Sequence, residues 1–225
     1  MKSRTIAFAI GLMACLAYGD IVFDVSFDGP DFIAGSTSPT GIPPDYPQYA
    51  PSLIVDSAAF GSQVARPGYL RFDPESIYAS GVHNISWRYL SEDNNTYGGW
   101  PNMAVTFSGS SVFLPNGSSP GDAYFYIDGN PLTTAPTPLN QVHDYAVTIN
   151  LESLTASFFV NGVQFATNAP IPSGATLDYV LFQVPGNNTA YIDNFRWEIV
   201  PEPSSLILIT LGFAAMMAMS ARGHR

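Results

Sequence analysis

The stretch that decides the fold is HDYAVTINLESLTASFFVNGVQFAT, residues 143–167. Its first part alternates between apolar side chains on one face and polar or small ones on the other: Tyr145, Val147 and Ile149 against Asp144, Ala146, Thr148 and Asn150. A period of two is typical of a β-strand with one buried face. Asn161-Gly162 then separates SFFV from VQFAT, and this pair predicts a β-hairpin because both residues accept a positive φ.

Short alternating segments separated by turn residues recur along residues 20–200, and no window shows sustained helical periodicity. In IVFDVSFD, residues 21–28, the alternation places the odd-numbered apolar residues on one face. Further strands are expected at 52–60, 68–72, 83–91, 102–107, 111–115, 123–128, 154–160, 163–167, 177–184 and 190–199. About a dozen short strands with Gly, Pro and Asn turns predict an all-β fold, a jelly-roll β-sandwich. The proline-rich segment 36–52 is expected to be a loop that lies on it.

Residues 20–200 are expected to form one domain of ordinary size, and its charge narrows the range of partners. Seventeen acidic residues face four arginines and no lysine, which gives a net charge of −13. Nucleic acid is not expected as a partner, because phosphate contacts need cations. The acidity favours solubility, and it leaves divalent cations, above all calcium, as candidate ligands.

Residues 1–19 have the plan of a secretory signal peptide. A basic start precedes an apolar stretch, 6–16, and the small residues at 17 and 19 fit cleavage before Asp20. The alternative is a lipoprotein signal in which Cys15 is acylated. Because Cys15 is the one cysteine of the chain, no disulfide or thiol chemistry is expected in the mature protein.

The last 25 residues, 201–225, combine three features. Pro201-Glu202-Pro203 comes first, residues 204–221 are uncharged and apolar enough for a short transmembrane helix, and Arg222 and Arg225 follow. Because positive residues stay on the cytoplasmic side, the domain is expected outside. This layout resembles the PEP-CTERM sorting signal. The resemblance implies recognition by exosortase, a membrane protease that cleaves near the Pro-Glu-Pro triplet.

Three segments of the domain resemble the concanavalin A-like, laminin-G-like lectin superfamily. They are VDSAAFGSQVARPGYLRF (55–72), HDYAVTINLESLTASFFVNGVQF (143–165) and YIDNFRWEI (191–199). The resemblance implies a lectin-like sandwich. In such folds the last strand commonly lies beside the first, so that 191–197 would pair with 21–27.

Catalysis is not expected. Concanavalin-like folds also contain glycosidases, whose usual signature is Glu-x-Asp-x-x-Glu on one strand. None of the four glutamates of the domain has that spacing: Glu75, Glu92, Glu152 and Glu198. A glycoside hydrolase is therefore a remote alternative. His83 and His143 lack the spacing of a zinc pair and are expected to be strand residues satisfied by their neighbours.

Two groups of oxygen-bearing side chains are candidate calcium ligands. One is the run Glu92, Asp93, Asn94 and Asn95, and the other joins Asp28 and Asp31 to Asp193. The alternative is that these Asp and Asn side chains hydrogen-bond to their own turns.

Exposed aromatic rings are the candidate sugar ligands. Tyr97 and Trp100 lie in the polar segment 91–101, where Gly98-Gly99 lets the chain bend. Tyr124 and Tyr126 share one face of their expected strand with Asp128. By the same alternation Trp87, Tyr89 and Trp197 are expected in the core.

Together these features predict an exported cell-envelope protein whose sandwich binds glycan or extracellular polysaccharide. The C-terminal helix is expected to retain it in the membrane until a sorting protease acts. The alternative is a structural or adhesive matrix protein without a dedicated ligand.

Overall fold

The computed structural model describes residues 20–28, 53–66, 69–92, 102–107, 110–113, 122–127, 130–183 and 189–200. Within these ranges the chain forms strands in two sheets and no helix, so the all-β prediction is confirmed. The expected signal peptide, the segment 36–52 and the C-terminal sorting signal lie outside these residues. Within the described ranges, no helix has the length and hydrophobicity of a membrane span.

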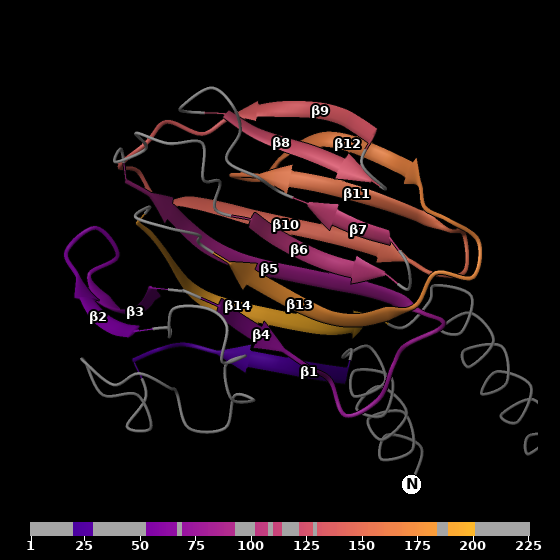
Figure 1. The fold of residues 1–225 in the computed structure, drawn as a ribbon, viewed down its shortest axis with the longest axis horizontal. Helices are drawn as coiled ribbons and strands as arrows, with labels where there is room; N and C mark the ends of the chain where they lie inside the picture. The colour runs from indigo at the N-terminus through magenta and orange to yellow at the C-terminus, as the bar shows by residue number, and fades with distance from the viewer. Residues whose placement is uncertain are drawn as a thin grey trace, which may run out of the picture.

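The larger sheet has eight strands (Figure 1). Seven follow one another in the order β12 (Val163–Pro170), β11 (Thr155–Val160), β10 (His143–Asn150), β5 (Val82–Ser91), β14 (Ala190–Val200), β3 (Ser62–Arg66) and β2 (Leu53–Ser57). The eighth, β1 (Asp20–Val25), pairs with β14. All of these pairings are antiparallel.

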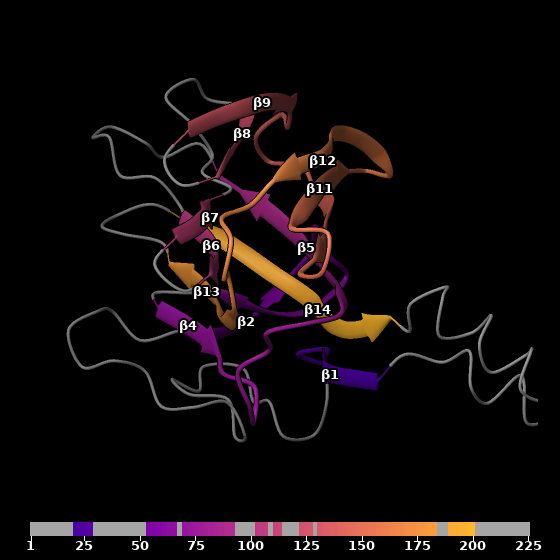
Figure 2. The same cartoon turned by 90° about the vertical axis from the view of Figure 1, so that its right-hand side faces the viewer.

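The second sheet has six strands. Their order is β4 (Tyr69–Phe72), β13 (Leu177–Gln183), β6 (Asn102–Phe107), β7 (Ser110–Phe113), β8 (Asp122–Ile127) and β9 (Asn130–Pro136). The two sheets form the two layers of a sandwich, which Figure 2 shows from the side.

One core joins the inner faces of the two sheets. Trp87 of β5 packs edge-on against Phe182 of β13, with ring centroids 5.5 Å apart. Trp87, Tyr89 and Trp197 are each at most 2% exposed, which confirms their predicted place in the core. Buried aromatic area of this kind is the main source of stability for the fold.

The first and last strands lie side by side, as the lectin resemblance implied. Asp20 to Val25 pair with Ile199 to Phe195. The predicted strand 21–28 was too long, because the chain leaves the sheet at Ser26 and turns. A register shift between Ile21 and Phe23 also breaks the predicted alternation, and Ile21 ends up 55% exposed.

The sequence did not predict β3 and β9 as separate strands. The sequence predicted one strand over residues 52–60, but β2 ends at Ser57, a tight turn follows in which Gly61 has a φ of 72°, and β3 begins at Ser62. β9 contains Pro131 and Pro136, which count against a strand. It lies at the edge of its sheet, where a missing backbone donor is tolerated.

The Asn161-Gly162 hairpin is present between β11 and β12. Both residues are left-handed, with φ of 51° and 75°. Asn161 also uses its side chain, because Oδ1 accepts from the backbone N–H of Asp144 at 2.9 Å and Nδ2 contacts Nδ1 of His143 at 3.1 Å. The turn is therefore tied to the neighbouring strand β10.

The ring nitrogens of His83 and His143 interact with neighbouring polar groups, as predicted. The indole N–H of Trp197 donates to Nδ1 of His83 at 3.2 Å, and Nε2 of His83 contacts the carbonyl of Ser80 at 2.9 Å. Nε2 of His143 contacts the carbonyl of Pro138 at 2.9 Å.

Candidate functional site

The outward face of the eight-stranded sheet presents three transverse rows of side chains, defined by the strand register. The middle row crosses six strands: Asp24, Arg196, Ser86, Ala146, Phe159 and Gln164. Beside it lie Glu198, Asn84, Thr148 and Ser157 in one row, and Asp193, Arg88 and Asp144 in the other. Directly opposed residues have Cβ atoms about 5 Å apart, so neighbouring members of these rows can contact one ligand.

A hollow of about 410 Å³ opens at the centre of the middle row. Ser86 and Ala146, two of the smallest side chains, pair across β5 and β10 and form its floor. Its walls include five further residues: Arg88, Asp144, Phe159, Gly162 and Asn194. This volume lies within the range of small-molecule sites, about 300–1,000 Å³.

Phe159 supplies the aromatic wall of the hollow. Phe158 points into the core and is fully buried, so the next residue of β11 points outward. Phe159 stands opposite Ala146 and is half-buried. One apolar ring surface therefore borders an otherwise polar face.

A β-bulge in β14 brings Asn194 over the hollow. Asp193 pairs with Arg88 and Arg196 pairs with Ser86, so two residues of β14 oppose Trp87. Asn194 has a φ of 51°, which asparagine tolerates better than most residues. The bulge also keeps Arg196 on the outward face while Phe195 is buried in the core.

Arg88 stands at the edge of the hollow between an acid and a ring. Its Nε lies 3.7 Å from Oδ1 of Asp144, and its guanidinium carbon lies 5.1 Å from the centre of the Phe60 ring. Phe60 belongs to a small second apolar cluster with Val64 and Leu90. This cluster covers one end of the outward face and holds Arg88 beside the hollow.

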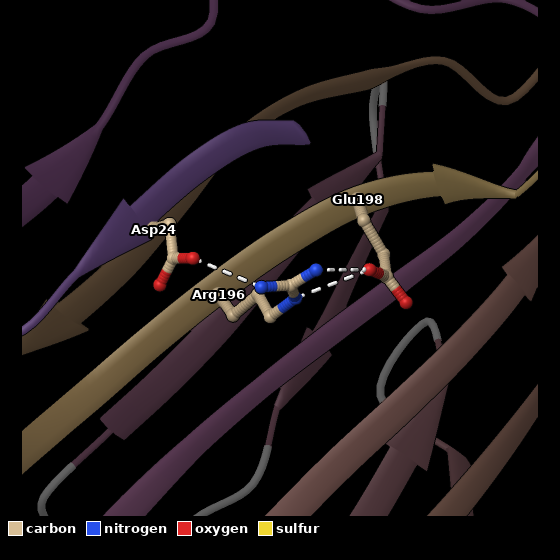
Figure 3. Close-up of polar contacts among 3 residues, drawn as sticks. All are labelled: Asp24, Arg196 and Glu198. Carbon is tan, nitrogen blue, oxygen red and sulfur yellow. Dashed lines mark hydrogen bonds and ion pairs between the residues drawn. The ribbon is translucent and has the colours of Figure 1, made fainter. Parts of the chain in front are cut away.

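Arg196 is fixed by two carboxylates (Figure 3). Its Nη1 donates to Asp24 at 2.9 Å, and its Nη2 donates to Glu198 at 2.9 Å. The hydrogen bond and charge of Glu198, and secondarily those of Asp24, raise the pKa of the guanidinium above its usual value. Arg196 remains fully charged and occupied by these partners.

Two of the predicted calcium ligands, Asp28 and Asp193, come close enough to interact electrostatically. Burial raises the pKa of Asp193, although hydrogen bonds from backbone N–H groups and Ser62 oppose that rise. Asp28 accepts from the backbone N–H of Gln63 at 2.8 Å, beside an open hollow of about 590 Å³. Asp28, Asp193 and Ser62 together supply two carboxylates and a hydroxyl, fewer than the six to eight oxygens that calcium prefers.

Of the other predicted calcium residues, the structure describes Glu92 alone. The backbone N–H of Glu92 donates to the carbonyl of Thr189 at 3.0 Å. Burial raises the pKa of Tyr191, and the hydrogen bond and charge of the Glu92 carboxylate raise it further. Asp31, Asp93, Asn94 and Asn95 lie outside the described residues. In the part of the chain that the structure describes, no three acidic, His or Cys side chains could hold a metal.

Tyr124 and Tyr126 share the outward face of β8, as predicted, but on the opposite side of the sandwich from the hollow. Their rings stack with centroids 6.3 Å apart, and both are half-buried. Their predicted companion Asp128 lies outside the described ranges, as do Tyr97 and Trp100. The tyrosine pair is therefore a second candidate surface.

The sequence interpretation missed the residues of the hollow. The sequence does contain a partial signal for the hollow: small side chains, Ser86 and Ala146, at outward positions of β5 and β10. That signal has meaning only once the two strands are known to be neighbours, and about sixty residues separate them.

No protein family description and no curated protein matches the sequence. Among solved structures, the "cellulose induced protein, Cip1" has a TM-score of 0.52 at 11% identity, covering 77% of this chain and 96% of that one. A GH131 β-glucanase catalytic domain from Podospora anserina has a TM-score of 0.50 at 16% identity, covering 82% and 98%.

A third similar structure is domain 4 of AbnA, a GH43 extracellular arabinanase from Geobacillus stearothermophilus, solved in complex with arabinotriose. Its TM-score is 0.50 at 15% identity, covering 84% of this chain and 97% of that one. At these identities the likeness shows the β-sandwich fold alone.

Proposed function

We propose that the hollow on the outward face of the eight-stranded sheet binds a saccharide. The observation that carries the proposal is a floor of small residues bordered by one aromatic ring and by hydrogen-bonding side chains. Sites for small ligands combine apolar walls with a few placed polar groups in this way. The names of two similar structures, one cellulose-induced and one bound to arabinotriose, are consistent with it.

Each side chain of the hollow has a role in this proposal. The Phe159 ring packs against the apolar face of a sugar ring, and the floor of Ser86 and Ala146 leaves room for that ring. The guanidinium of Arg88 donates to sugar hydroxyls, and the carboxylate of Asp144 accepts from them. Because Asp144 is largely exposed, it can reorient toward a ligand.

Binding of the purified protein to arabinan, xylan and β-glucan, measured by affinity electrophoresis and calorimetry, tests this proposal. Phe159→Ala is expected to weaken binding at least about tenfold, a loss of about 1.4 kcal/mol. Leu132→Ala removes a 38% exposed apolar side chain from β9 of the other sheet and serves as the matched control.

A double variant, Tyr124→Ala with Tyr126→Ala, separates the two candidate surfaces. Loss of binding in that variant, with Phe159→Ala unchanged, would place the site on the six-stranded sheet and overturn the proposal. Absence of binding to every saccharide would favour the alternative of a matrix protein without a dedicated ligand.

We also propose that the protein binds saccharide without cleaving it. The spacing of the glutamates in the sequence supports this part, whereas the catalytic domain among the similar structures argues for the alternative of a glycoside hydrolase. Release of reducing ends from the bound polysaccharides is the direct test. Cleavage that is lost in Asp144→Asn would establish the hydrolase.

Export and sorting are proposed from the sequence alone. The signal-peptide plan of residues 1–19 and the triplet, apolar segment and arginines of 201–225 support delivery to the cell envelope, with anchoring by the C-terminal helix and processing by an exosortase-type protease. Mass spectrometry of both termini of the mature protein tests this proposal. An intact N-terminus beginning at Met1 would contradict it.

A further inference from the structure

The charge around the hollow is negative despite its two arginines. Among the described residues, the three rows expose three carboxylates, on Asp24, Asp144 and Glu198, against the guanidinium groups of Arg88 and Arg196, whereas Asp193 of the same rows is buried. The outward face therefore exposes one more negative than positive charge where a ligand would lie. The whole domain, these residues included, has a net charge of −13.

Each guanidinium group of this face lies beside at least one of these acids. Arg196 donates to Glu198 and Asp24, both at 2.9 Å. Nε of Arg88 lies 3.7 Å from Oδ1 of Asp144, and Arg88 is opposite Asp193 in the strand register. Sites that recognise a carboxylate use an arginine whose two parallel N–H donors are free for the ligand. On this face, Arg196 spends that capacity on the protein's own acids, and Arg88 has the Asp144 carboxylate beside it.

We propose that the hollow selects neutral saccharides and rejects uronic acids and other anionic glycans. This inference rests on the proposed function and names the ligand class of that same site. A uronate carboxylate placed over Ser86 and Ala146 would meet the surplus of negative charge, and each arginine of the three rows already has a carboxylate of the protein beside it. Hydroxyl groups meet no such repulsion, and both carboxylates and guanidinium groups can hydrogen-bond to them.

Glu198 is the side chain that can test the charge argument without touching the hollow's lining. Glu198→Gln keeps the shape, removes one negative charge from the rows and weakens the two hydrogen bonds from Arg196, because a neutral amide oxygen replaces the carboxylate. Asp122→Asn removes one negative charge from β8 in the opposite sheet and is the matched control. A long-range effect of total charge would appear equally in both variants.

The experiment measures binding of the full-length wild type and both variants to arabinan, xylan and β-glucan, and to polygalacturonate and alginate, at low salt in EDTA and again with calcium. The wild type is expected to bind a neutral polysaccharide at least about tenfold more tightly than either anionic one. Glu198→Gln is expected to narrow that ratio at least threefold, and Asp122→Asn is expected to leave it unchanged.

Polygalacturonate or alginate binding as tight as neutral binding, in EDTA or with calcium, would overturn the inference and leave the saccharide site in place. An unchanged ratio in Glu198→Gln, or equal narrowing in both variants, would also overturn it. Absence of binding to either class would overturn the proposed function itself, so the two failures are distinguishable.

Discussion

The two faces of the eight-stranded sheet are made by the same strands and have opposite characters. On the inner face, Trp87 and Tyr145 stack with centroids 5.7 Å apart and planes 2° from parallel, and Phe158 lies 4.9 Å from Phe125 of the other sheet. On the outer face, the corresponding neighbours are Ser86 and Ala146, which are small and leave a hollow.

This difference separates the residues that pack the core from those of the proposed saccharide site, at the level of single positions. A period of two lets one strand fill the core with alternate side chains and leave the others free to vary. The outer face can therefore carry charges and a small-residue floor that would be costly in the core. Phe158 and Phe159, adjacent in β11, show the contrast most directly, because one is fully buried and the other borders the hollow.

Phe158→Ala is expected to have the largest effect on stability and tests the difference between the two faces. Removing a fully buried ring from the core should lower the free energy of unfolding by about 3–5 kcal/mol. Phe159→Ala should lower it by about 1 kcal/mol or less while abolishing most saccharide binding. Chemical denaturation measures the first quantity. Equal destabilisation by the two variants would contradict the division between the faces.

The next largest effect on stability is expected at the Asn161-Gly162 turn, which joins β12 to β11, the strand that carries Phe159. A Cβ added at Gly162 would meet no atom within 4 Å, but its φ of 75° is left-handed. Gly162→Ala should therefore lower the free energy of unfolding by about 1–2 kcal/mol through backbone strain alone. Gly162→Asn, which tolerates this φ better, should recover much of the loss in the same denaturation assay.

Much of this fold could be predicted because its signals are local. Alternation in residues 143–150 assigned each side chain to the correct face, and Asn161-Gly162 identified the hairpin. The pairing of β1 with β14 could be anticipated only through the lectin resemblance, since no local signal links strands at the two ends of a domain.

The candidate site could not be predicted, because it depends on long-range register. Ser86 meets Ala146 through the pairing of β5 with β10, and Asn194 reaches the hollow through a bulge that shifts β14 by one residue. Neither the pairing nor the bulge leaves a mark in a short window of sequence. The prediction therefore relied on exposed aromatic residues and selected Tyr124 and Tyr126, which lie on the other sheet.

A smaller effect, confined to the inner face, is expected from pH. Burial lowers the pKa of His83 below 6.5, so the folded state favours the neutral ring that accepts from Trp197. Below about pH 6.5 the unfolded chain binds the proton first, and stability should fall by at most about 1.4 kcal/mol per pH unit until His83 protonates in the folded state as well.

His83→Asn is the comparison for that measurement. It should reduce stability at neutral pH but remove the His83 contribution to the slope between pH 6.5 and 5. Thermal unfolding in a series of buffers measures both curves. Parallel curves for the wild type and the variant would show that His83 does not titrate across the unfolding transition.

The smallest effect on stability and one of the largest on function are expected from the same change on the outer face. Ala146→Leu fills the floor of the hollow without entering the core, because residue 146 points outward between Ser86 and Phe159. The free energy of unfolding should change by no more than about 0.5 kcal/mol, as for most surface substitutions. Saccharide binding should be lost, because the added side chain occupies the space over which the sugar ring would lie. Binding that survives in Ala146→Leu, measured by calorimetry beside an unchanged denaturation curve, would mean that the outward face is merely the solvated side of the sheet.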